Sequence, residues 1–256
     1  MSTIVVNQQG SVARVVMSRP EKHNAFNPEL IQELHQTFLR LGQDESVRVV
    51  VLSGEGKSFS AGADLDWMKG MGEADEAENL RSAREMGELF RAIDQCPKPV
   101  VGAIQGAALG GGAGLVCSVD IAIAGPKALF GFTEVRLGLV AAVISPFVLR
   151  RLGYSVAREK LLTGERFGAD EAFRVGLVHQ STDNLEEAVE ATVTRLLKGS
   201  TQAQAASKKL LSKVWTLPED KQLEPAAKCI ADARASRDGR EGLAAFLEKR
   251  SPRWVD

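Results

Sequence analysis

Two hydrophobic periodicities alternate along the first part of the chain. Short β-branched runs at residues 3–6, 12–17 and 47–52 predict strands, and the last is almost uninterrupted, as in a strand covered on both faces. Before that last run, Asn27 and Pro28 precede apolar residues at helical spacing. Asn27 is therefore expected to cap a helix that Pro28 begins. The pattern predicts a strand, a helix and a further strand.

The same alternation continues to residue 124. A long helical pattern covers residues 75–95, and a strand pattern at residues 100–104 follows two prolines. The glycine-rich stretch 110–118 is typical of a short helix, and a strand is expected at residues 121–124. Strands that alternate with helices predict an α/β fold.

Strand patterns stop after Leu185. Amphipathic helical patterns fill the rest of the chain, at residues 187–197, 202–215, 223–237 and 240–249. Such a tail has too little core to fold alone. We expect a core at residues 1–185 that carries the functional site, and a C-terminal helical region at residues 186–256.

Composition excludes several functional classes. The 256 residues are 44% hydrophobic and 25% charged with a net charge of −1, which gives no indication of a nucleic-acid or membrane surface. The apolar run 137–149 is interrupted and too short to span a bilayer, and the N-terminus lacks a signal-peptide pattern. The cysteines at 96, 117 and 229 lack metal-ligand spacing, so we expect reduced buried thiols, no metal and a cytoplasmic location.

A glycine run marks the first candidate for chemistry. Gly110, Gly111 and Gly112 lie between an apolar strand and a helical pattern. Glycines here let the backbone approach a ligand while the first helix amides point at it, which suits an anion or an oxyanion. Taken alone, the run could equally mark a tight turn or close helix packing.

Glu134 is the second candidate, because it is the only acid between residues 121 and 158. A carboxyl in an apolar setting has a raised pKa and exchanges protons near neutrality. The competing interpretation is an acid that serves only the local helix dipole.

Three segments together resemble the enoyl-CoA hydratase/isomerase (crotonase) superfamily. They are Lys57-Ser-Phe-Ser-Ala-Gly-Ala-Asp-Leu65, the glycine run and the segment around Glu134, and the resemblance extends from about residue 15 to residue 254. It implies a spiral of repeated ββα units whose C-terminal helices build a homotrimer, often paired into a homohexamer. One position departs from the hydratase pattern, since Gly114 stands where family hydratases usually carry a second glutamate.

The resemblance also implies roles for individual residues. Glu134 would carry the proton, and the backbone N–H groups of Ala63 and Gly111 would form an oxyanion hole for a thioester. A bulkier residue at 111 is expected to block the thioester, so Gly111→Val should harm catalysis more than stability. Coenzyme A or substrate contacts are implied for Lys22, His23, Ala25, Ala61, Asp64, Leu65, Asp66, Phe246 and Lys249. Lys22 and Lys249 could also be ordinary surface lysines, and Asp64 could cap a helix that begins near Leu65.

The function that the resemblance implies is addition of water to an enoyl-CoA thioester, with coenzyme A as part of the substrate and no permanently bound cofactor. The segments 134–147 and 241–250 are similar to bacterial methylglutaconyl-CoA hydratase-like members, so a branched or carboxylated substrate is expected, as in leucine or isoprenoid breakdown. With one acid, Glu134 performs both proton transfers or another group orients the water. That group could be the carboxylate of the substrate or one of Asp120, Ser118, Ser145 and Arg136.

Two other functions remain open. An enoyl-CoA isomerase needs only one carboxylate to move a proton between Cγ and Cα, which suits the glycine at 114. A non-catalytic acyl-CoA-binding or RNA-associated member is the second alternative. The near-neutral charge and the presence of Glu134 argue against it.

Overall fold

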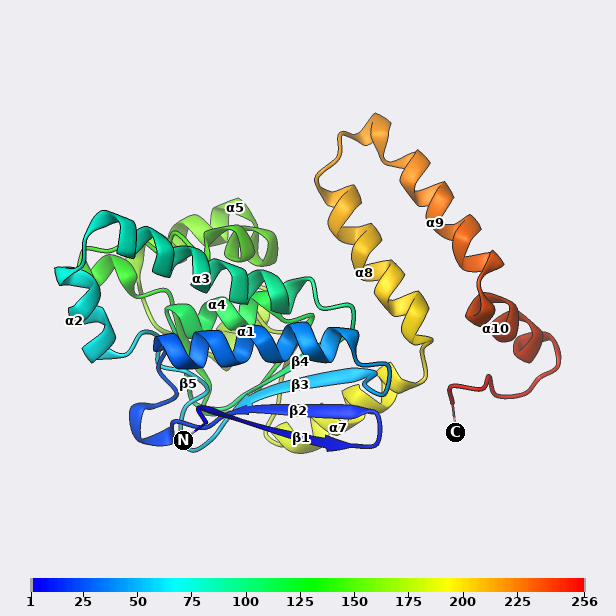
Figure 1. Ribbon diagram of the computed structural model, residues 1–256, viewed down its shortest axis with the longest axis horizontal. Helices are drawn as coiled ribbons and strands as arrows, with labels where there is room; N and C mark the ends of the chain where they lie inside the picture. Colours follow the sequence, from blue (N-terminus) through cyan, green and yellow to red (C-terminus); the bar gives the residue numbers. More distant parts are fainter. Residues whose placement is uncertain (1, 256) are drawn as a thin grey trace.

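A central sheet organises the protein in the computed structural model, which describes residues 2–255 (Figure 1). Within these residues six strands pair in the order β1 (Ile4–Gln9), β2 (Val12–Met17), β3 (Val49–Gly54), β4 (Val100–Ile104), β6 (Ile121–Ala124) and β9 (Gln180–Ser181). The first pair is antiparallel and the others are parallel. A smaller sheet holds β5 (Ala107–Leu109), β7 (Leu129–Gly131) and β8 (Phe167–Gly168). The predicted strands at 12–17, 100–104 and 121–124 are confirmed.

Helices cover both faces of the central sheet. On one face lie α1 (Pro28–Gln43), α3 (Glu76–Asp94) and α4 (Gly111–Ser118), and on the other lies α7 (Leu185–Leu197) (Figure 1). Val49, Val51 and Val101 pack against Val189 of α7, while their neighbours in the same strands face the main core. The middle strands are therefore buried on both faces, which explains the uninterrupted apolar run that predicted β3.

Local signals placed the helix starts correctly. The side chain of Asn27 accepts a hydrogen bond of 2.9 Å from the Leu30 N–H and caps α1, with Pro28 in its first turn. Asp64 caps α2 (Leu65–Glu73) by accepting from the Asp66 N–H at 3.0 Å. Both caps satisfy backbone donors that a helix start leaves unpaired.

One long helix was not predicted. Helix α5 (Ser145–Thr163) begins within the apolar run 137–149 and is interrupted at Gly153, whose φ of 71° is not helical. That break disturbs the helical period of the sequence. Across the described residues 2–255, no helix has the length and apolarity to cross a membrane. The remaining short elements are η1 (Pro20–Lys22), η2 (Glu134–Leu137), α6 (Ala169–Arg174) and η3 (Glu219–Lys221).

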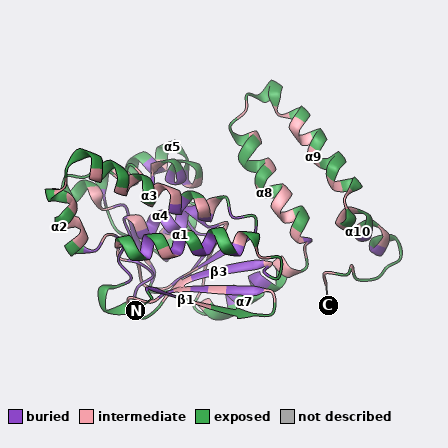
Figure 2. Cartoon of the chain, viewed as in Figure 1, coloured by how far each residue is buried: buried purple, intermediate pink, exposed green. Residues whose placement is uncertain are grey.

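The C-terminal helices form an arm that projects from the core. It consists of α8 (Thr201–Trp215), α9 (Leu223–Ala235) and α10 (Arg237–Leu247), and Figure 2 shows it as mostly exposed or partly buried. The four predicted helical segments after residue 185 correspond to α7 and these three helices. Since α7 packs on the sheet, the packing favours a division between core and arm after α7.

Arg48 attaches the arm to the core. Its guanidinium donates to the carbonyl oxygens of Leu197 at 2.7 Å, Gly199 at 2.9 Å and Trp254 at 2.8 Å. These bonds join the α7–α8 connection and the C-terminal tail to the start of β3. The arm is thereby held at two points that are far apart in sequence.

Candidate functional site

Glu134 is the acid at the centre of the site. It begins η2, directly after the strand β7, and its Oε2 is buried without a hydrogen-bond partner among the described residues. Burial raises the pKa of the Glu134 carboxyl above its ordinary value. A buried acceptor with no partner is costly to stability and is typical of a group kept for chemistry.

The glycine run brings backbone against this carboxylate. A methyl group at Gly110 would lie only 3.2 Å from Glu134 Oε1. Gly110 has φ +52° and ψ −120°, a conformation that favours glycine, and its N–H donates to Gly131 O at 2.8 Å. The turn into α4 is therefore fixed beside Glu134.

Two backbone donors are free next to this turn. The N–H groups of Phe26 and Asp64 pair with Gly62 O at 2.7 Å and Phe26 O at 2.8 Å, so the N–H of Ala63 between them points the other way. Gly111 is the first residue of α4, where an N–H has no partner within the helix. Among the described residues neither N–H has a hydrogen-bond partner.

The loops that carry these donors are in contact. A methyl group at Gly62 would lie 3.0 Å from Leu109 O and 4.0 Å from the Cα of Gly110, and one at Gly112 would overlap Ser60 O. The donors of Ala63 and Gly111 thus belong to adjacent backbone segments, with Glu134 on the Gly110 side. Two free N–H groups and one unpaired acid can stabilise an oxyanion and move a proton.

The expectation for Gly111→Val was wrong in one respect. A methyl group at Gly111 would lie 2.8 Å from Cε2 of Phe26, a fully buried ring. Substitution here therefore disturbs the core directly. The glycine is required for packing as well as for the approach of a ligand.

Gly114, the position of the absent second acid, faces apolar side chains. A methyl group there would overlap Cγ2 of Ile144 and would lie 3.2 Å from Cε1 of Phe90. Of the groups considered for orienting water, Asp120 forms an ion pair of 2.6 Å with Lys208 and accepts from the Val100 N–H, and is thus structural.

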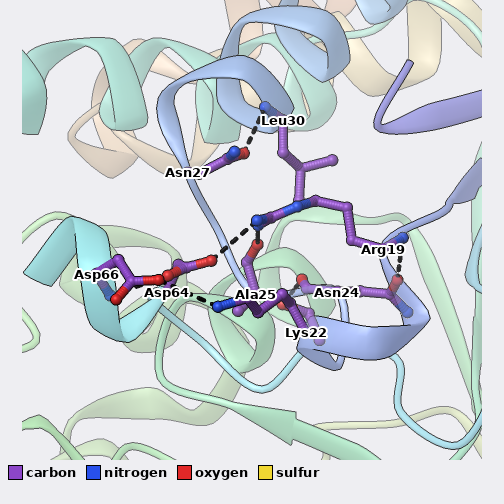
Figure 3. A network of polar contacts seen from close by, with 9 residues as sticks. Arg19, Lys22, Asn24, Ala25, Asn27, Leu30, Asp64 and Asp66 are labelled. Carbon is purple, nitrogen blue, oxygen red and sulfur yellow. Dashed lines mark hydrogen bonds and ion pairs between the residues drawn. The ribbon is translucent and has the colours of Figure 1, made fainter. Parts of the chain in front are cut away.

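Seven of the predicted coenzyme A residues lie on two chain segments that are joined by hydrogen bonds, and Figure 3 shows Lys22, Ala25, Asp64 and Asp66 among them. Ala61 N–H donates to His23 O at 3.0 Å, and Ser60 Oγ donates to Asn24 O at 2.8 Å. His23 has a φ of 52°, and its ring contacts Ser58 Oγ. The structure therefore brings together Lys22, His23, Ala25, Ala61, Asp64, Leu65 and Asp66.

Asp64 has a structural role that its position in the motif did not reveal. Its carboxylate is buried, caps α2 and accepts from Arg19 Nη2 at 2.9 Å, while Arg19 also donates to Ala25 O (Figure 3). Burial alone would raise the pKa of Asp64, but Arg19 and the Asp66 N–H hold it below its ordinary value. The Lys22–Asp66 ion pair, at 3.1 Å, lies on the surface.

Phe246 and Lys249 lie elsewhere in the chain. Phe246 is on α10, in the arm, and α2 is at the opposite end of the molecule (Figure 1). Phe246 is 79% exposed and borders a cavity of about 860 Å³ between α8, α9 and α10. Within one chain these two residues do not join the other predicted coenzyme A residues.

Two of the three cysteines are buried, as expected. Cys96 and Cys117 are buried free thiols whose pKa burial raises, whereas Cys229 is only partly buried, contrary to expectation. Within residues 2–255, no three side chains of His, Cys, Asp or Glu converge as metal ligands would.

Comparisons with known proteins show the family and the fold of the chain. The enoyl-CoA hydratase/isomerase family profile matches residues 7–256. The crystal structure of an enoyl-CoA hydratase from Shewanella pealeana superposes with a TM-score of 0.95 at 41% identity, over 98% of this chain and 96% of that one.

Two relatives match over nearly their whole length. One from Thermus thermophilus, named provisionally as an enoyl-CoA hydratase, is 37% identical over 96% of this chain and 98% of its own. A crotonyl-CoA hydratase from Syntrophomonas wolfei is 32% identical over 98% of this chain and 97% of its own. The fold is the crotonase fold, and the chain belongs to the enoyl-CoA hydratase/isomerase family.

Proposed function

We propose that the protein adds water across the Cα=Cβ bond of an enoyl-CoA thioester. The observation that carries this proposal is the buried, unpaired Oε2 of the half-buried Glu134, close to the free N–H groups of Ala63 and Gly111. Coenzyme A enters as part of the substrate and leaves as part of the product. The family and the names of the relatives support the same reaction.

In the proposed mechanism, the thioester oxygen accepts hydrogen bonds from Ala63 and Gly111. Glu134 takes a proton from water as the water oxygen bonds to Cβ, and the electrons of the double bond move onto the thioester oxygen as an enolate. Glu134 then returns the proton to Cα, and the thioester carbonyl forms again. One carboxyl with a raised pKa serves as base and as acid.

The proposed coenzyme A site is the surface of the two joined loops. His23, Ala25, Ala61 and Leu65 offer backbone and apolar contacts there, and the exposed Lys22–Asp66 pair offers charged groups. Asp64 contributes by holding the loops together through Arg19. Its carboxylate is already occupied and does not bind the ligand.

We further propose that the chain assembles as a homotrimer, or as a homohexamer of paired trimers. The arm exposes large apolar side chains that a free monomer would leave in water, among them Leu211, Trp215, Leu223, Leu243 and Phe246. Assembly would let Phe246 and Lys249 reach the coenzyme A of a neighbouring copy. Light scattering at micromolar concentration tests this, and a monomer would refute it.

The substrate that suits a single acid carries its own carboxylate. We propose a branched, carboxylated enoyl-CoA such as 3-methylglutaconyl-CoA, whose carboxylate would help hold the water, in leucine or isoprenoid breakdown. The two buried free thiols support a reducing compartment such as the cytoplasm.

The second candidate is an enoyl-CoA isomerase, favoured by the glycine at 114 and by the family, which includes both activities. Reaction in ¹⁸O-labelled water separates the two. A hydratase places the label at Cβ of a 3-hydroxyacyl-CoA, whereas an isomerase moves the double bond and incorporates no oxygen. An unlabelled product with a shifted double bond would show that the protein is an isomerase and not a hydratase.

A further inference from the structure

Gly114 is a glycine for reasons of space. It lies within α4 and does not have the positive φ that favours glycine, so its backbone accommodates any residue. A Cβ at this position would overlap Ile144 Cγ2, and would lie 3.1 Å from Ile144 Cβ and 3.2 Å from Phe90 Cε1. The volume that a side chain at 114 would need is therefore filled by Ile144 and Phe90.

Ile144 is held rigidly in that volume. It is 3% exposed and precedes α5, where its carbonyl accepts from the N–H groups of Phe147 and Val148, each at 3.0 Å. Its β-branched side chain has little rotameric freedom. Phe90 is fully buried and packs edge-on against Phe26, with ring centroids 6.2 Å apart.

This apolar wall lies against α4, close to the glycine that faces Glu134. Gly114 follows Gly110 by four residues, and its N–H donates to Gly110 O at 3.0 Å. Gly110 is the residue whose Cβ position lies nearest the Glu134 carboxylate. Ile144 therefore packs against α4 one turn away from the residue that faces the acid.

We propose that Ile144 is a specificity-determining residue, which fills the place of a second carboxylate and leaves an apolar wall beside Glu134. Because the wall offers no acceptor for water, the site selects enoyl-CoA substrates that carry a carboxylate of their own over simple ones such as crotonyl-CoA. This inference rests on the proposed hydratase function. Ile144 acts by shape, and no proton passes through it.

The first arm of the test measures packing without any substrate. Gly114→Ala, Ile144→Ala and the double variant are compared by thermal unfolding. Gly114→Ala alone should lower Tm by several degrees, and Ile144→Ala should remove most of that loss. Gly70→Ala is the matched control, because Gly70 also lies in a helix but has open space around it, so its effect should add to that of Ile144→Ala. If the changes in Tm caused by Gly114→Ala and Ile144→Ala also simply add in the double variant, the proposal is overturned.

The second arm measures selectivity. Gly114→Glu in the Ile144→Ala background should raise ¹⁸O incorporation into crotonyl-CoA at least tenfold over Ile144→Ala alone, and should lower the preference for 3-methylglutaconyl-CoA. If that double variant does not fold, Gly114→Asp in the Ile144→Ala background is measured instead, because the aspartate side chain is shorter. A folded double variant that binds coenzyme A and gains no crotonyl-CoA hydration overturns the proposal.

The two arms separate this inference from the proposed function. If the unchanged protein incorporates ¹⁸O into 3-methylglutaconyl-CoA while the double variant gains nothing, the role of Ile144 fails and the hydratase stands. If the unchanged protein labels neither substrate, the hydratase fails and the selectivity role fails with it. In each case the thermal comparison still shows whether the side chain of Ile144 excludes a residue larger than glycine at position 114.

Discussion

Arg19 and Asp64 form a nearly buried ion pair, with 2.9 Å between Nη2 and Oδ2, that joins the two loops of the proposed coenzyme A site. Their side chains are 14% and 6% exposed. Arg19 also donates to Ala25 O, and Asp64 also caps α2. Two backbone segments that carry the ligand contacts are thus positioned by one pair of side chains.

Arg19→Met should destabilise the protein by about 3 kcal/mol, because removing one partner leaves a buried charge uncompensated. Chemical denaturation measures this loss. Lys22→Met is the matched control, since its ion pair with Asp66 is exposed and should change the stability much less than Arg19→Met does. Equal effects of the two variants would show that the buried pair has no special role.

Glu134→Gln should make the protein more stable than the unchanged chain at pH 8. The pKa of Glu134 is raised by burial, so the folded state binds its proton more tightly than the unfolded state. The favourable contribution is present below the unfolded pKa and is lost as pH rises through the folded pKa. The difference in Tm between the two proteins should therefore grow from pH 4 to pH 8, and a constant difference would contradict the raised pKa.

Gly111→Val should lower both solubility and Tm, because its side chain meets the buried ring of Phe26. Overpacking of this kind costs about 1–3 kcal/mol or more. Phe26→Leu in the same chain should recover part of the loss in thermal unfolding. A Gly111→Val protein with unchanged Tm and no activity would restore the original expectation.

Arg48→Met should loosen the arm without unfolding the core. The variant loses the bonds to Leu197, Gly199 and Trp254 that join the arm to β3. Hydrogen exchange should become faster at residues 198–255 and stay unchanged in β3 and β4. Uniformly faster exchange in the core would mean that the arm and the core unfold as one unit.

Local patterns in the sequence predicted much of the fold. The Asn27 cap, the strand of residues 100–104 and the four C-terminal helices depend on neighbours in sequence, and the structure has them all. Helix α5 was missed because Gly153 interrupts its period. An amphipathic pattern does not say which surface covers it, so the sequence did not show that α7 packs on the sheet.

The sequence indicated the proposed reactive groups and gave no indication of the residues that support them. Glu134 stood out as one acid in an apolar segment, and the glycine run showed where backbone donors would lie. Arg19 and Ile144 gave no signal, because their partners Asp64 and Gly114 lie 45 and 30 residues away in sequence. Such pairings depend on tertiary packing, which residue spacing does not encode.

The most direct test of the central claim is the turnover of Glu134→Gln with 3-methylglutaconyl-CoA, measured beside its affinity for coenzyme A. Removal of the proton carrier at nearly constant shape should lower kcat by about 10²–10⁴-fold, the usual worth of general acid–base catalysis. Coenzyme A binding should be unchanged, because the joined loops do not involve Glu134. A variant that keeps more than about a tenth of the activity would contradict the assignment of Glu134 as the group that moves the proton.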